Sequence, residues 1–147
     1  MSVAKNGDTV SLLKECNAGC KMATSSIEQL SEYIHTPEFK KLVDEYNNEH
    51  VELGDECHAL LNEVGEDEKD PHPMAKAMSW MTSEVKMSIN GDEKKAAKIL
   101  MEGCSMGIQS LSEYINKYSE ADASVLKIAM KLRNSEEEML EKLEQYV

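Results

Sequence analysis

Apolar side chains recur at spacings of three and four residues along most of the chain, the period that places them on one face of an α-helix. None of these stretches shows the strict alternation of apolar and polar residues that is typical of a half-buried β-strand. We therefore predict an all-α protein with helices over about residues 9–34, 37–64, 72–90, 92–118 and 121–146.

Residues that begin or end helices mark the limits of these stretches. Asn6-Gly7-Asp8 provides a turn and an N-cap before the first helix, and Pro37 suits the first turn of the second. Gly65 and Asn90-Gly91 are typical of positions just after a helix. Short turns within the first and last pairs of long helices predict two tight hairpins. The roughly 27 residues between the hairpins are enough for a helical crossover along the bundle.

The two predicted hairpins share repeated sequences. Gly-Cys-x-Met occurs at residues 19–22 and 103–106, and Leu-Ser-Glu-Tyr-Ile occurs at residues 30–34 and 111–115. The second helices of the two hairpins also align under one constant shift, which places Glu136 where His50 stands. Both of these polar residues occupy positions that the apolar stripe would otherwise fill, so we expect them in the core.

The register of each hairpin predicts which side chains lie at one level. Helices rising about 1.5 Å per residue bring residues at equal distances from a turn opposite each other. A turn at His35 places Cys20 opposite His50, and a turn at Glu120 places Cys104 opposite Glu136. We therefore predict a central polar layer with one side chain from each long helix: Cys20, His50, Cys104 and Glu136.

Charge and composition narrow the classes of function. The net charge is −12 and Arg133 is the single arginine, which argues against nucleic acid, because phosphates are bound by clustered Lys and Arg. No apolar run has the length of a membrane span or the position of a secretion signal. We expect one domain over residues 1–147, located in the cytoplasm, with its cysteines as free thiols.

Two repeated hairpins, a long crossover and a central polar layer resemble the ferritin-like four-helix bundles. Within them, the chain resembles along its whole length a bacterial family of unknown function with an extra helix between the second and third bundle helices. Ferritin-like sites hold two metals with a Glu on each of two helices and Glu-x-x-His on the other two. Here Cys20 and Cys104 stand in place of the first two Glu residues. Asn47 stands three residues before His50, and Arg133 three residues before Glu136, at the positions where the motif has Glu. Only His50 matches the ligand set that the resemblance implies.

The predicted layer has the composition of a mononuclear metal site. Two thiolates, an imidazole and a carboxylate suit tetrahedral zinc, or iron, and four protein ligands would make the site structural. The alternative is that the cysteines are small buried groups while His50 and Glu136 hydrogen-bond across a metal-free core. Cys16 is a weaker candidate ligand: it lies one turn before Cys20, and that pair would suit copper or simply pack.

Three functions remain open. The leading interpretation is a bacterial cytoplasmic ferritin-like protein that is not an enzyme and keeps a degenerate or structural metal site in its core. The alternatives are a metal-dependent redox protein or metalloenzyme that uses the Cys/His/Glu layer, and a helical interaction scaffold without metal. No residue is marked as catalytic, because no activating base or separate cleft is visible. A methionine stripe on the crossover helix, with Trp80 beside it, predicts a homodimer: Met74, Met78 and Met81.

Overall fold

The computed structural model describes residues 3, 5–66 and 82–147. Within these ranges the chain forms helices and no strand, which confirms the all-α prediction for this part of the protein. The α-helices are α1 (Gly7–Leu30), α2 (Pro37–Glu63), α4 (Ser83–Ile89), α5 (Glu93–Lys117) and α6 (Ala123–Leu143). Short 3₁₀ helices follow α1 and α6: η1 (Ser31–Tyr33) and η2 (Glu144–Tyr146).

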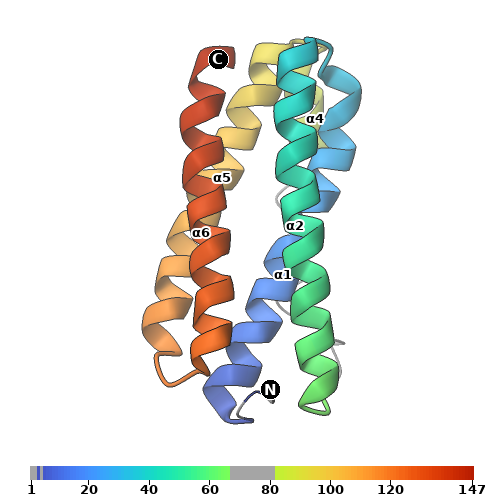
Figure 1. The fold of residues 1–147 in the computed structure, drawn as a ribbon. Coiled ribbons are helices and arrows are strands. Elements are labelled where there is room, and N and C mark those ends of the chain that lie inside the picture. Colours follow the sequence, from blue (N-terminus) through green and yellow to red (C-terminus); the bar gives the residue numbers. More distant parts are fainter. Residues whose placement is uncertain (1–2, 4, 67–81) are drawn as a thin grey trace.

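The four long helices lie side by side (Figure 1). Helices α1 and α6 run in one direction, and α2 and α5 run in the other. Contacts are most extensive within the two hairpins, between α1 and α2 and between α5 and α6, and α1 and α2 also pack against α6. Helix α2 ends at the end of the bundle opposite the start of α5.

Local chemistry fixes the helix ends close to their predicted positions. The Asn6 side chain caps α1 by accepting a hydrogen bond from the Thr9 amide at 2.8 Å. Pro37 is the first residue of α2, where its missing amide hydrogen costs nothing. Asn90 and Gly91 adopt left-handed backbone angles, φ 47° and 72°, which end α4. Helix α1 ends earlier than predicted, because the last turn of the expected helix is the tighter 3₁₀ helix η1.

Part of the predicted crossover helix lies outside the described residues. Of the expected range 72–90, α4 accounts for residues 83–89. Met74, Met78, Met81 and Trp80 all fall within the undescribed segment. The homodimer that they led us to expect therefore stays a prediction.

The apolar core has two parts that meet at the middle of the long helices. One part contains Tyr46 of α2 and Met139 of α6, and the other contains Leu53 of α2 and Leu132 of α6. Between these residues each helix contributes a buried polar side chain, His50 from α2 and Glu136 from α6. Polar residues therefore do occupy the central level of the core, as the sequence pattern predicted.

Candidate functional site

A buried acid-base pair joins α2 to α6 at the centre of the molecule. The His50 Nε2 atom lies 2.8 Å from Glu136 Oε1, and the two residues are only 1% and 6% exposed. The interpretation that these side chains hydrogen-bond across the core is confirmed. Since polar groups removed from water are stable only when paired, each residue depends on the other to stay inside.

The second ring nitrogen of His50 determines where protons can lie. Nδ1 is 2.9 Å from the backbone carbonyl of Tyr46, and because a carbonyl only accepts, Nδ1 carries a hydrogen and donates it. One further proton then lies between Nε2 and the carboxyl of Glu136. Whichever of the two atoms holds it, the His50–Glu136 pair is neutral as a unit.

Tyr46 forms a polar cluster with His50 and Glu136, and the sequence pattern did not mark it as a polar core residue. Its hydroxyl lies 2.7 Å from both carboxyl oxygens of Glu136 and donates to them. Burial, together with the nearby negative charge of Glu136, raises the pKa of Tyr46 well above its usual value, so the hydroxyl keeps its proton. Tyr46 fits the apolar stripe and aligns with Leu132 in the repeat, which hid its polar role. The available signal was a core tyrosine one turn before His50, since a buried hydroxyl requires a partner.

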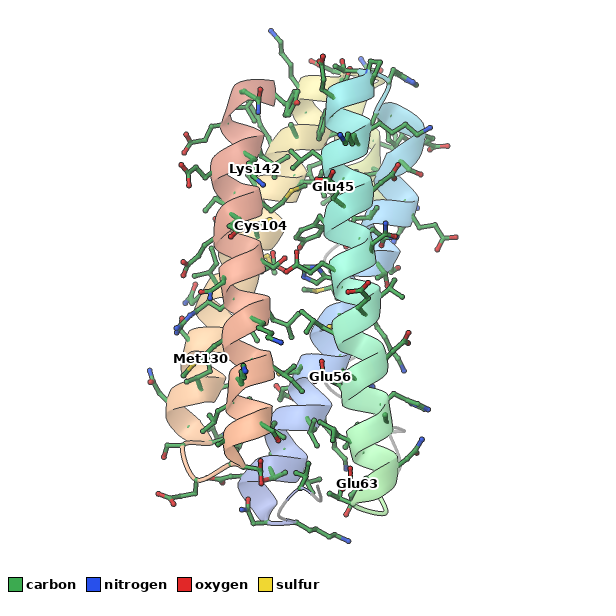
Figure 2. All side chains as sticks on the ribbon, viewed as in Figure 1. Glu45, Glu56, Glu63, Cys104, Met130 and Lys142 are labelled. Atoms are coloured by element: carbon green, nitrogen blue, oxygen red, sulfur yellow. The ribbon has the colours of Figure 1, made fainter. Side chains whose placement is uncertain are left out.

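Cys104 brings α5 to the same carboxyl group. Its thiol lies close enough to Glu136 and Tyr46 for both groups to influence its pKa. Burial, and then the negative charge of Glu136, raise the pKa of the Cys104 thiol, which therefore stays protonated. Cys104 lies among the side chains that occupy the space between the helices (Figure 2). Groups from α2 and α5 thus surround the carboxyl group of Glu136.

Cys20 is the member of the predicted layer that packs elsewhere. It faces Gly54 of α2, where an added Cβ would lie 3.2 Å from the Cys20 Cβ, so glycine permits this close helix contact. Burial raises the pKa of the Cys20 thiol, with further contributions from Cys57 and Glu136. Cys20 is therefore close enough to sense the charge of Glu136, but no hydrogen bond between them is present.

The weaker candidate, Cys16, is paired with a cysteine from another helix. Its thiol forms a side-chain hydrogen bond with Cys57 of α2, and this bond, followed by burial, raises the pKa of Cys16. All four cysteines are buried free thiols, as expected from the sequence. The partner of Cys16, Cys57, is fully buried in the core.

The candidate metal ligands occupy one region but do not form a preassembled coordination site. Within residues 5–66 and 82–147, no group of three or more His, Cys, Asp or Glu side chains is arranged to hold a metal ion. Metal binding would also require the Cys20 and Cys104 thiols to lose protons that burial retains. Zinc or iron at Cys20, His50, Cys104 and Glu136 stays a prediction.

A cavity of about 320 Å³ opens between α1 and α5, directly over the polar cluster. His50, Leu132 and Glu136 contribute to its lining from α2 and α6. The remaining lining residues come from the two facing helices: Glu15, Cys16, Ala18, Gly19 and Met22 from α1, and Met106, Gly107, Ser110, Leu111 and Tyr114 from α5. Its size is at the lower end of the range of small-molecule sites, and its walls are mostly apolar.

Two glycines shape this cavity. A Cβ on Gly107 would lie 3.2 Å from Glu136 Cδ, so glycine at this position lets Glu136 pack closely against α5 without being displaced. A Cβ on Gly19 would meet no atom within 4 Å, which shows that Gly19 borders open space. Gly19 belongs to the repeated Gly-Cys-x-Met segments, whose methionines, Met22 and Met106, also line the cavity.

A second, shallower pocket reaches His50 from between α1 and α2. It has a volume of about 330 Å³, and Cys20, Val51 and Gly54 are among its lining residues. It does not include Glu136 in its lining. The α1–α5 cavity is therefore the one of these two spaces that reaches both members of the buried pair.

No protein-family model, curated protein or solved structure matches this chain. Among the described residues, no helix combines the length and apolar character needed to cross a membrane.

Proposed function

We propose that this protein is a non-enzymatic, ferritin-like helical bundle that binds a small molecule in the cavity between α1 and α5. One observation carries this proposal: the buried His50–Glu136 pair lines an otherwise largely apolar cavity. A buried ionisable pair contributes little net stability compared with apolar packing, so stability alone is a weak reason for its presence. A few converging polar groups in an apolar cavity are the usual arrangement of a ligand site.

The ferritin-like part of the proposal is supported by the course of the chain. Two antiparallel hairpins pack together, and the second begins at the opposite end of the bundle from the point where the first finishes. Bundles with one long crossover have this arrangement of helix directions. The internal repeat and the polar residues at the centre of each hairpin agree with it.

Hydrogen bonding around Glu136 supports binding over catalysis. The Cys20 and Cys104 thiols have raised pKa values and stay protonated at neutral pH, whereas nucleophilic cysteines react as thiolates. Tyr46 also keeps its proton and is committed to Glu136. The cluster thus holds Glu136 in place, so that its carboxyl oxygens can act as fixed acceptors for a ligand in the cavity.

Filling the cavity tests this function. Gly19→Leu places a side chain in open space on a helix, so we expect the fold to persist and small-molecule binding to fall at least tenfold. Binding of a fragment collection to the ¹⁵N-labelled protein would be followed through the amide signals of Gly19 and Gly107. Ser105→Leu is the matched control, because Ser105 is exposed on α5 and does not line the cavity.

Two results would contradict the proposal. In the first, no fragment perturbs the amides around the cavity at millimolar concentration. In the second, folded Gly19→Leu protein binds the same fragments as tightly as the unmodified protein does. Either result would leave the buried pair without a ligand-binding role.

A metal at the polar cluster is the second candidate, and one contact favours it. Among the predicted ligands, His50 hydrogen-bonds to Glu136, and the Cys104 thiol lies close enough to Glu136 for the carboxylate to raise its pKa. Metal content of untagged protein purified without added metal tests this directly. Near-stoichiometric zinc or iron that is lost in the Cys20→Ser, Cys104→Ser double variant would support the metal site. A metal-free protein that stays folded would exclude it and leave the small-molecule proposal.

A further inference from the structure

We infer that the α1–α5 cavity accepts a small organic cation, an ammonium group carried on a compact apolar body. This inference rests on the proposed function and specifies the chemical class of the ligand. It is argued from the charge, the hydrogen-bonding groups and the size of the cavity.

The lining carries a net negative charge. Glu136 is balanced by His50, because the pair shares one proton and is neutral as a unit. Glu15 contributes a second carboxylate, and among the residues that the structure describes no lysine or arginine lines the cavity. A bound anion would therefore lie near an uncompensated carboxylate, whereas a cation would be attracted to it.

The polar groups at the Glu15 side of the cavity also favour a donor. Tyr114 lines the cavity with Glu15, and burial together with this neighbouring carboxylate raises the pKa of Tyr114, so the tyrosine keeps its proton beside an acceptor. The carboxylate oxygens of Glu15 retain further acceptor capacity, since each carboxylate accepts up to about four hydrogen bonds. An ammonium group supplies donors only, which is the complement of this acceptor.

The rest of the lining selects an apolar body of limited size. Ala18 and Met22 of α1, Leu111 of α5 and Leu132 of α6 contribute apolar side chains to the lining. Thioether side chains such as Met22 adapt to the shape of apolar groups and contact aromatic rings favourably. About 320 Å³ suits a ligand with one ring or a short alkyl chain rather than a nucleotide or a long lipid.

Three probes of nearly equal shape test the charge preference: 2-phenylethylammonium, 2-phenylethanol and 3-phenylpropionate. Each would be titrated into ¹⁵N-labelled protein at about 0.15 M salt, where long-range attraction to the acidic surface is screened beyond about 8 Å. We expect the cation to bind about two- to fivefold more tightly than the alcohol, because a partly exposed ion pair changes affinity by about this factor. The anion should bind most weakly.

Glu15→Gln identifies the source of the preference. This variant keeps the shape of the side chain and removes its charge, so the preference for the cation over the alcohol should fall toward one while alcohol binding is retained. Glu28→Gln is the control, because Glu28 is exposed on the same helix and does not line the cavity. It should leave the preference unchanged.

The outcomes separate the inference from the proposed function. If the alcohol or the anion binds in this cavity as tightly as the cation, or if Glu15→Gln leaves the preference unaltered, the cation inference is wrong while ligand binding stands. If none of the three probes perturbs the amides of Gly19 and Gly107, both the inference and the function it rests on are contradicted.

Discussion

Glu136 is the residue on which the polar cluster depends. The Tyr46 hydroxyl donates to both of its oxygens, the His50 ring shares a proton with it, and the Cys104 thiol lies close by, so groups from two other helices surround it. These groups stabilise a carboxyl group in a position that the apolar stripe would otherwise fill. His50 and Glu136 were predictable because each interrupts the stripe with a polar side chain. Tyr46 was not predictable in this way. Its ring counts as an apolar side chain in the pattern, so the pattern does not indicate the polar role of its hydroxyl.

Tyr46→Phe removes one donor and leaves the ring in place. We expect the free energy of unfolding to fall by about 1–3 kcal/mol, since the lost bond is to a buried carboxyl group. Urea denaturation measures the change. Tyr33→Phe is the control, because its hydroxyl pairs with the exposed Glu32 and an exposed bond contributes little. A Tyr46→Phe protein as stable as the unmodified one would show that the hydroxyl adds nothing to the cluster.

At the scale of the helices, glycine decides how closely α5 approaches the cluster. Gly107 lies on α5 at the point where this helix packs against Glu136. The sequence repeat drew attention to the Gly-Cys-x-Met segments, and their methionines do line the cavity. The repeat did not indicate the roles of Gly54 and Gly107, because close contact depends on which residues face each other across two helices, and helical period alone does not define that.

Alanine substitutions at two glycines test this packing. Gly19→Ala should stabilise the protein by about 0.5–1 kcal/mol, since alanine favours helix and its methyl group meets no atom within 4 Å. Gly107→Ala should gain less or lose stability, because its Cβ would lie 3.2 Å from Glu136 Cδ and displace that side chain. Urea denaturation of the two variants gives the comparison. Equal stabilisation at both positions would mean that α5 does not pack tightly on Glu136.

For the molecule as a whole, the sequence predicted the helices and their ends because capping residues and apolar periodicity act locally. Pro37 and Asn90-Gly91 illustrate this, since each stands at the helix limit expected of it. The level of His50 and Glu136 was also predictable, because helices of equal rise fix the register of a hairpin. Cys20 shows the limit of that reasoning: residues at one level can face different neighbours, and the rotation of each helix depends on tertiary packing.

The cavity is the feature of the whole molecule that no local pattern predicted. Its walls come from α1 and α5, and residues from α2 and α6 complete its lining, so it exists only when both hairpins have packed together. The position of a ligand in this space is therefore the most direct test of the account. Magnetisation transfer from bound 2-phenylethylammonium to methyl-labelled protein would report that position.

We expect transfer from the probe to the methyl groups of Met22 and Leu111, which line the cavity from α1 and α5, and loss of both signals in Gly19→Leu protein. Met87 and Met130 serve as internal controls, since both are exposed and neither lines the cavity. Transfer to Met87 or Met130 without transfer to Met22 and Leu111 would place the probe on the surface and contradict a binding site between α1 and α5.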